Sequence, residues 1–310
     1  MHRVLSRRAL GLLAAIAALG ACTPAPPANA AKARVAACQP ARVLEIPLRQ
    51  ERNFLLAAAT LDGQPTTLLI DTGAETTTLT PEIAASLRLP ADTGHPGTIV
   101  GITGTVPSAN VVLGRLALGN VVLTTAHSVG VGALPSLEGI EPPVAGLLGV
   151  DVLADYEVEL DLPGRRMALY AQHPCAGYVP WQDAISVPFQ RTHSGLAFID
   201  ARVNGRTVRA LLDTGARTSL LTRQTARAVG VTERMLASDE ARAGSGVGSA
   251  SVAFRHHRFA SLGLPGAVDA DMAANVGDVR LPGADMLLGA DYVGRRRVWI
   301  SYATGRLFLR

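Results

Sequence analysis

The chain has 310 residues, of which 48% are hydrophobic and 31 are glycine, and its formal net charge is +4. This length allows one large domain or two medium ones, and the composition predicts a folded, turn-rich globular protein. Arg3, Arg7 and Arg8 carry most of the excess positive charge, so the remaining residues are close to neutral. The charge therefore argues against a nucleic-acid-binding protein.

The first residues have the pattern of an export signal. After the three arginines, Ala9–Gly20 is an apolar stretch too short to span a bilayer as a stable helix. It leads into Leu-Gly-Ala-Cys at residues 19–22, which resembles a bacterial lipobox, in which the cysteine is acylated and becomes the mature amino terminus. An ordinary signal peptide cut after residues 28–30 is the alternative. We expect a signal peptide over residues 1–21, a lipid anchor at Cys22, and an exported, periplasmic protein anchored to the outer membrane.

Residues 22–40, which are rich in proline and alanine, are expected to form a tether between the anchor and the fold. The chain has only three cysteines, Cys22, Cys38 and Cys175. If Cys22 carries lipid, two cysteines remain in an oxidising compartment. A Cys38–Cys175 disulfide is one possibility, and two free cysteines are the other.

The rest of the chain contains an internal repeat with an offset of 142 residues, in which Thr60–Leu87 aligns with Arg202–Val229. Asp-Gly at residues 62–63 and Asn-Gly at residues 204–205 both predict a two-residue hairpin turn of type I′. Eight residues after each of these glycines, an apolar strand ends in Asp-Thr-Gly-Ala. The two copies therefore predict the same local structure twice.

A short helix is predicted after each motif. A threonine side chain can accept a backbone N–H at the start of a helix, so Thr80 is expected to cap a helix over Pro81–Leu87. Thr222 is expected to cap the matching helix over Arg223–Val229, and Gly230 to end it.

The match resumes at two Leu-Leu-Gly sequences, each followed by an acidic residue and by two strands joined at a glycine. Between motif and Leu-Leu-Gly, each copy has a glycine-rich stretch that predicts a long hairpin with a flexible tip, around Gly101–Gly104 and Gly244–Gly248. Strands dominate both copies, which predicts an all-β protein with two pseudo-symmetric lobes. The expected boundaries are lobe 1 over residues 41–172, a linker over 173–184, and lobe 2 over 185–310.

Asp71 and Asp213, the aspartates of the two motifs, are the candidate catalytic residues. A carboxylate buried at the end of a strand is costly unless something satisfies or uses it. If the lobes bring the two carboxyl groups to about 3 Å from each other, both cannot ionise, and the pair shares one proton. A water molecule between them could then be deprotonated by one aspartate while the other polarises a peptide carbonyl.

This doubled pattern of apolar strand, Asp-Thr-Gly-Ala and distant Leu-Leu-Gly resembles the retropepsin-like aspartic protease family. The resemblance covers nearly all of residues 41–310, as two retropepsin-sized units fused in tandem. It implies a bilobal fold of two β-barrel lobes with short helices. It also implies an endopeptidase that cleaves peptides or unfolded protein segments, with no cofactor and no metal, and with a complete site in a monomer.

The resemblance also implies roles for residues near the aspartates. The hydroxyl groups of Thr72 and Thr214 would link the two loops beneath the carboxyl groups. Gly73 and Gly215 would allow a close approach of the backbone. Four residues would pack against the loops: Leu148, Gly149, Leu288 and Gly289. The two glycine-rich tips would be flaps over a substrate cleft.

The fourth residue of each motif is an alanine, Ala74 or Ala216. A serine at this position could hydrogen-bond the carboxylate and favour its ionised form. Alanine therefore predicts an aspartate pair that titrates at higher pH, and an activity optimum that is less acidic than that of pepsin.

Other readings remain open. The alternative function is a catalytically inactive, peptide-binding envelope lipoprotein of the same fold.

The third Asp-Thr-Gly, at residues 92–94, follows no buried strand and is expected to form a turn. His256 and His257 are expected on opposite faces of a strand and at the surface. Gly294–Arg297 is expected to be a solvated hairpin edge. The sequence has no Cys-x-x-Cys, His-Glu-x-x-His or Gly-x-Ser-x-Gly motif.

Overall fold

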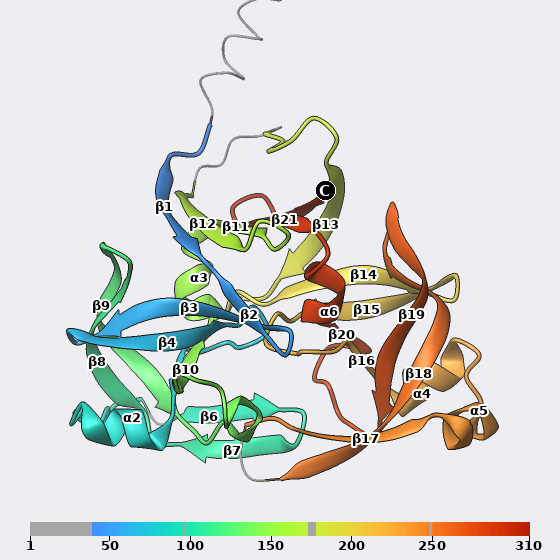
Figure 1. Ribbon diagram of the computed structural model, residues 1–310, viewed down its shortest axis with the longest axis horizontal. Helices are drawn as coiled ribbons and strands as arrows, with labels where there is room; N and C mark the ends of the chain where they lie inside the picture. The colour runs from blue at the N-terminus through green and yellow to red at the C-terminus, as the bar shows by residue number, and fades with distance from the viewer. Residues whose placement is uncertain (1–38, 96, 173–177, 248–249) are drawn as a thin grey trace, which may run out of the picture. The chain divides into compact units, whose positions relative to one another are not determined.

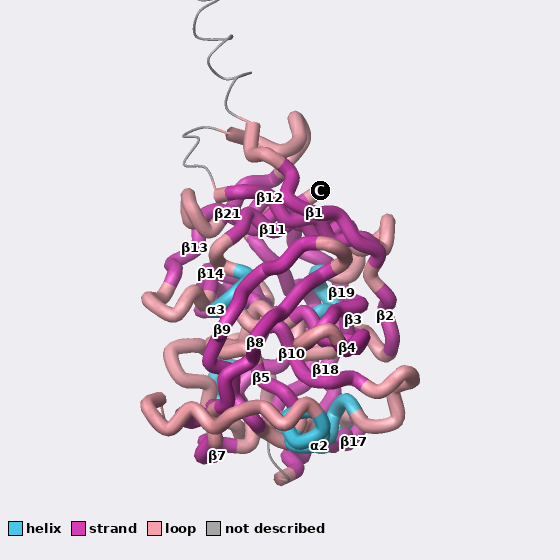
Figure 2. The backbone as a smooth tube through the Cα atoms, turned by 90° about the vertical axis from the view of Figure 1, so that its left-hand side faces the viewer, coloured by secondary structure: helices cyan, strands magenta, loops and turns pink. Residues whose placement is uncertain are grey.

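Strands make up most of the computed structural model of the protein, and its helices are short (Figures 1 and 2). The structure describes residues 39–95, 97–172, 178–247 and 250–310. No helix in these segments is both long and apolar enough to cross a membrane. The predicted lipid anchor at Cys22 and the possible disulfide between Cys38 and Cys175 lie outside the described residues.

The first lobe is built on a seven-stranded sheet in the order β2-β3-β4-β10-β5-β9-β8, and β3 also pairs with β8. The strands are β2 (Arg49–Glu51), β3 (Phe54–Leu61), β4 (Gln64–Ile70), β5 (Thr78–Leu79), β8 (Val111–Leu118), β9 (Val121–Val131) and β10 (Val144–Leu148). Asp62 and Gly63, between β3 and β4, have φ angles of 46° and 85°, which agrees with the predicted type I′ turn. β10 runs parallel to β4 and places Leu148 beside Ile70.

The second lobe repeats this arrangement in the order β14-β15-β20-β16-β19-β18-β17, with an added pairing of β14 and β18. The strands are β14 (Ala197–Val203), β15 (Arg206–Leu212), β16 (Leu220–Thr222), β17 (Glu240–Ser245), β18 (Ser251–Leu264), β19 (Ala267–Gly277) and β20 (Met286–Leu288). Asn204 and Gly205 have φ angles of 48° and 77°, again those of a type I′ turn. β20 runs parallel to β15 and places Leu288 beside Leu212.

A further group of strands joins the lobes, in the order β1-β12-β11-β21-β22-β13, at the top of Figure 1. The strands are β1 (Arg42–Pro47), β11 (Tyr156–Asp161), β12 (Arg166–Ala171), β13 (Ile185–Arg191), β21 (Arg297–Ser301) and β22 (Arg306–Leu309). The lobes meet at the antiparallel pair β11 and β21, where Val158 lies opposite Ile300. The fold is therefore the predicted bilobal, all-β fold of aspartic proteases.

The two predicted helices are α2 (Pro81–Ser86) and α4 (Arg223–Ala228), each one residue shorter than expected. The side chain of Thr80 accepts a backbone N–H of α2 at 3.4 Å, and that of Thr222 accepts one of α4 at 3.1 Å. Gly230 follows α4 with φ of 95°, in the left-handed region that favours glycine. The threonine caps predicted from sequence are confirmed.

The two glycine-rich stretches differ from each other. In lobe 1 the stretch forms two hairpins: β6 (Gly97–Gly101) with β7 (Gly104–Ser108), which is a separate sheet, and then β8 with β9. In lobe 2, β17 pairs with β18, and the same long strand β18 continues into a second hairpin with β19. A hairpin is therefore present at the predicted position in both lobes, but it is short in lobe 1, where β7 and β8 are separate strands. We call β6–β7 flap 1 and β17–β18 flap 2; both lie at the bottom of Figure 1.

The prediction that His257 lies at the surface was wrong. Its ring is buried, with Nδ1 2.7 Å from a carboxylate oxygen of Asp239, so it is not at the surface. His256 lies on the other side of the strand and is 3.0 Å from the side-chain oxygen of Asn275. α5 (Glu233–Ser238), which the sequence reading did not predict, packs on β18 and ends at Asp239. The alternation of faces was correct, but α5 covers one of them.

The sequence Gly294–Arg297 is also not a solvated edge. Arg296 forms an ion pair with Asp269 and donates to the backbone oxygen of Tyr292 at 2.7 Å. Arg297 donates to Glu159 of lobe 1 at 2.7 Å. The reason is that Arg297 begins β21, an interior strand, and meets Glu159 of the neighbouring β11, whereas Arg296, just before the strand, meets Asp269 of β19.

Candidate active site

The loops that follow β4 and β15 meet between the lobes and carry Asp71 and Asp213. The backbone N–H of Gly73 donates to Asp71 at 2.9 Å, and those of Gly215 and Ala216 each donate to Asp213 at 3.0 Å. The two carboxyl groups lie within hydrogen-bonding reach of each other. The structure thus brings together two aspartates that are 142 residues apart in sequence.

Each glycine of the motif faces the aspartate of the other lobe. A Cβ atom at Gly73 would lie 2.5 Å from Oδ1 of Asp213, and one at Gly215 would lie 2.6 Å from Oδ1 of Asp71. A side chain at either position would displace the opposite carboxyl group. The missing side chains are therefore what permits the aspartates to approach.

The threonines of the two motifs exchange hydrogen bonds across the lobes. The backbone N–H of Thr72 donates to Oγ1 of Thr214 at 3.0 Å, and that of Thr214 donates to Oγ1 of Thr72 at 3.1 Å. The hydroxyl of Thr72 donates to the oxygen of Leu212, and that of Thr214 to the oxygen of Ile70, at 2.9 and 2.7 Å. Both threonines are fully buried, and every polar atom in this exchange has a partner.

The Leu-Leu-Gly sequences lie directly against the aspartate loops. The backbone N–H of Asp71 donates to the oxygen of Leu148 at 3.0 Å, and that of Asp213 donates to the oxygen of Leu288 at 3.0 Å. Gly149 and Gly289 follow, and each starts a single helical turn, α3 (Val150–Leu153) or α6 (Ala290–Val293). A Cβ at Gly149 would lie 2.8 Å from the backbone carbon of Thr76, and one at Gly289 would lie 2.9 Å from the backbone nitrogen of Ser219.

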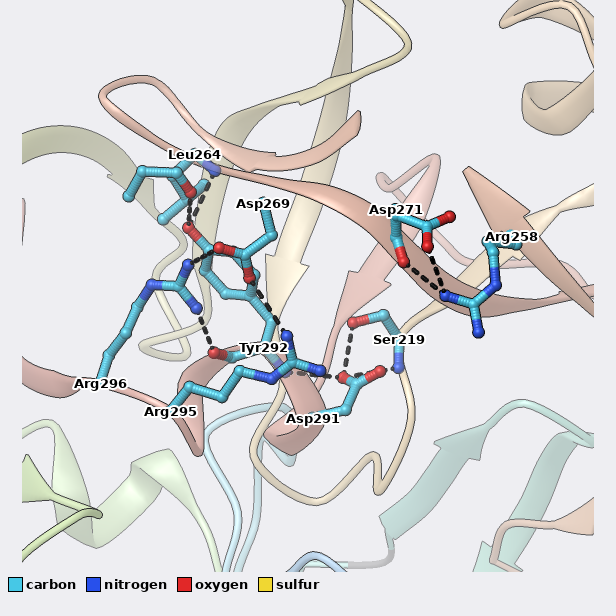
Figure 3. A network of polar contacts seen from close by, with 10 residues as sticks. Ser219, Arg258, Leu264, Asp269, Asp271, Asp291, Tyr292, Arg295 and Arg296 are labelled. Atoms are coloured by element: carbon cyan, nitrogen blue, oxygen red, sulfur yellow. Dashed lines mark hydrogen bonds and ion pairs between the residues drawn. The ribbon is translucent and has the colours of Figure 1, made fainter. Parts of the chain in front are cut away.

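Two acidic residues, Asp151 and Asp291, support the loops in a way that the sequence reading did not assign. Oδ1 of Asp151 accepts the backbone N–H and the hydroxyl of Thr77 at 2.9 and 2.8 Å. Oδ1 of Asp291 accepts the same two groups of Ser219 at 2.9 and 2.8 Å (Figure 3). The sequence did contain the signal, because an acidic residue follows both Leu-Leu-Gly sequences.

Among the residues that the structure describes, His127 adds a contact in lobe 1 that has no counterpart in lobe 2. Its Nε2 lies 2.8 Å from the second carboxylate oxygen of Asp151, and this hydrogen bond raises the pKa of the imidazole. Ala126 on β9 and Asp271 on β19 both have a positive φ, which marks them as equivalent positions of the two lobes. The residue of lobe 2 that is equivalent to His127 is therefore the buried Met272. The His–Asp–Thr chain therefore belongs to one lobe.

The electrostatics of the pair favour retention of a proton. Burial raises the pKa of Asp71, partly offset by the hydrogen bond from Gly73. Burial and then the charge of Asp71 raise the pKa of Asp213 well above its ordinary value, against the hydrogen bond from Ala216. Two adjacent carboxyl groups in such a place hold one proton between them to a higher pH than either would alone.

Comparison with known families agrees with this geometry. A family model described as aspartyl protease matches residues 57–152, and one described as gag-polyprotein putative aspartyl protease matches residues 199–295. Together they span well over half of the chain, and each match contains one Asp-Thr-Gly-Ala motif and one Leu-Leu-Gly sequence. The fold and the site thus define a protein of two tandem units of the aspartyl protease type. The chain belongs to the retropepsin-like aspartic protease family.

One similar solved structure is the crystal structure of Basic 7S globulin from soybean. The two chains share 11% sequence identity and align with a TM-score of 0.47, over 87% of this chain and 95% of that chain. No curated protein sequence gives a significant match.

Proposed function

We propose that the protein is an aspartic endopeptidase that hydrolyses peptide bonds with Asp71 and Asp213. The observation that carries this proposal is that two carboxyl groups, one from each lobe, lie side by side. Backbone N–H groups and the threonine exchange hold the loops that carry them. The raised pKa values support a pair in which one aspartate is ionised and the other protonated.

In this mechanism a water molecule lies between the two carboxyl groups. The ionised aspartate takes a proton from the water as the water oxygen attacks the peptide carbonyl carbon. The protonated aspartate donates its proton to the carbonyl oxygen, which gives a tetrahedral diol. Proton transfer to the amide nitrogen then breaks the C–N bond and releases an amine and a carboxylic acid. Both aspartates act as general acid and base, and no covalent intermediate forms.

The flaps support binding of an extended peptide. The hydroxyl of Thr103 in flap 1 donates to the backbone oxygen of Val247 in flap 2 at 2.9 Å, so the flap tips meet. Val247 packs against an apolar cluster of lobe 1 that also contacts Ala74, and Ile102 against one of lobe 2 that also contacts Ala216. We therefore expect a substrate that binds as a strand beneath the flaps, with apolar side chains at the bond that is cut.

The test is cleavage of a peptide library by the purified protein, beside Asp71→Asn and Asp213→Asn. Both variants should lose cleavage while remaining folded, with a cooperative thermal unfolding transition, because the amide is similar in size to the carboxyl group. Equal cleavage by wild type and variants would show a contaminating protease. Binding of peptides without cleavage at any pH would instead support the inactive peptide-binding protein.

The place of action is a separate proposal, supported by the sequence pattern at residues 1–22. We propose that the protein is exported and held at the outer membrane through a lipid on Cys22. A Cys22→Ala variant should then move from the membrane fraction to the soluble fraction. Unchanged fractionation would favour an ordinary signal peptide cut later in the sequence.

A further inference from the structure

The residue that directly follows each Asp-Thr-Gly-Ala motif is charged, and the two charges are opposite. It is Glu75 in lobe 1 and Arg217 in lobe 2, at the same offset of 142 residues as the aspartates. Both residues are exposed. Within the described segments, neither of them forms an ion pair. Two charges without a counter-ion therefore lie at matching positions beside the site.

Each of the two charged residues is held by the opposite lobe. The hydroxyl of Ser194, in lobe 2, donates to Oε1 of Glu75 at 2.7 Å. The side-chain amide of Asn53, in lobe 1, donates to the backbone oxygen of Arg217 at 3.2 Å. The guanidinium carbon of Arg217 also lies 5.4 Å from the centre of the Phe54 ring. These contacts fix both charges at the junction of the lobes.

Arg217 is connected through Phe54 to the Asp71 loop and to flap 2. Phe54, beneath its guanidinium, belongs to the apolar cluster that contacts both Ala74 of the motif and Val247 of flap 2. That cluster forms a wall from the Asp71 loop to a flap tip. The repeat places Glu75 at the equivalent position on the other side of the aspartate pair, four residues after Asp71 as Arg217 is four after Asp213.

We infer that Glu75 and Arg217 give the two ends of the substrate cleft opposite charges. This inference rests on the proposed function and names its substrate class: extended peptides with a basic residue on one side of an apolar cleavage site and an acidic residue on the other. Four residues of chain reach at most about 14 Å, so the two charges act on substrate residues roughly two to four positions from the bond that is cut.

The charges would also set the direction of the bound chain. A cleft with two equal halves can accept a peptide in either direction, because both directions give the same contacts. Opposite charges at the two ends remove this equivalence, since one direction pairs unlike charges and the other opposes like charges. Glu75 and Arg217 are thus specificity-determining residues. They fix the direction in which the peptide chain passes Asp71 and Asp213.

The test uses two fluorogenic peptides of identical composition with the same apolar cleavage site. One has Lys on the amino-terminal side and Asp on the carboxy-terminal side, and the other has the reverse order. We expect kcat/KM for the two to differ roughly tenfold, since two exposed pairs are made in one peptide and opposed in the other, and to converge at high salt. The double variant Glu75→Arg/Arg217→Glu should invert the preference. Equal rates in the wild type, or a preference that the double variant keeps, would overturn the inference.

Controls separate this inference from the proposed function. Arg42→Glu/Glu45→Arg swaps an exposed ion pair on β1, in the sheet that joins the lobes, and should leave the preference unchanged. If no peptide is cut, the proposed function has failed, and the same preference is then measured as the ratio of peptide affinities for the Asp213→Asn variant. A ratio of one in that measurement overturns the inference independently. Glu75→Gln/Arg217→Gln, which adds no new charge, should bring the ratio to one.

Discussion

The two lobes hold their aspartates through the same contacts but support those contacts differently. In both lobes, an acidic residue after Leu-Leu-Gly accepts two hydrogen bonds from the aspartate loop. In lobe 1 that residue, Asp151, also contacts His127, which can titrate near neutral pH. In lobe 2 the position of this histidine is taken by the apolar Met272. The geometry at the site is thus kept in duplicate, whereas the lobes differ one contact further out.

The largest effect is expected at the two glycines, where the lobes should be equivalent. Gly73→Ala and Gly215→Ala each place a Cβ against the opposite carboxyl group. Each should lower kcat/KM on a neutral peptide by about 100-fold or more, because a displacement of about 1 Å at a reacting group costs that much. Gly94→Ala is the control, since its Cβ would meet only Asp92, at 3.5 Å. Loss in only one of the two variants would show that the lobes contribute unequally.

The threonine exchange tests the same equivalence through stability. Thr72→Val removes one donor and one acceptor and leaves the N–H of Thr214 and the oxygen of Leu212 without partners. Buried groups without partners cost about 1–3 kcal/mol each, so the free energy of unfolding should fall by about 2 kcal/mol or more, and equally for Thr214→Val. Serine at either position keeps the hydroxyl and should lose much less. Denaturant unfolding measures the free energy of unfolding of the valine and serine variants. Additive effects in the double valine variant would contradict a shared network.

A smaller effect is expected from the aspartate pair when stability is measured against pH. The folded-state pKa of Asp213 is raised above its ordinary 3.8, so the folded state holds more protons than the unfolded state above that pH. The contribution of Asp213 to stability is therefore full below about pH 3.8 and is lost as pH rises through the raised pKa. Because the two carboxyl groups titrate as a pair, Asp213→Asn and Asp71→Asn should each gain stability relative to wild type as pH rises from 4 to 7. A constant difference across that range would contradict the raised pKa.

The smallest effect is expected at His127. Its pKa is raised above 6.5, so the stabilisation from its contact with Asp151 is full below pH 6.5 and is lost as pH rises through the folded-state pKa. His127→Gln should lower the free energy of unfolding by about 0.5–1 kcal/mol at pH 6 and by less at pH 9. His95→Gln removes a histidine whose side chain is 78% exposed and should change little. An effect of His127→Gln that does not vary with pH would assign the residue a packing role.

Local features of the fold could be predicted from the sequence because they depend on neighbouring residues. The type I′ turns at Asp62 and Asn204 and the caps at Thr80 and Thr222 follow from a few residues each. The repeat then identified Asp71 and its partner without any knowledge of the path between them. Bilobal all-β architecture followed from the same repeat and is confirmed.

The remaining features depend on contacts between distant segments. Alternation placed His257 opposite its neighbour, but only the packing of α5 on β18 decides which face is buried. Arg297 was expected to be solvated because the sequence does not say that β21 is an interior strand of the sheet joining the lobes. The acidic residues Asp151 and Asp291 were visible as a pattern, yet their role needs the loop that folds back onto them.

Both aspartate loops belong to one chain, and this has a consequence for how the lobes can change. A site made by two identical chains must carry every substitution twice, because the symmetry of the dimer copies it. In a tandem chain, each copy can change alone, so Glu75 can oppose Arg217 and His127 can stand where the other lobe has Met272. The assembly of the site is also intramolecular, and therefore independent of protein concentration. The fusion of the lobes is what makes an asymmetric cleft possible.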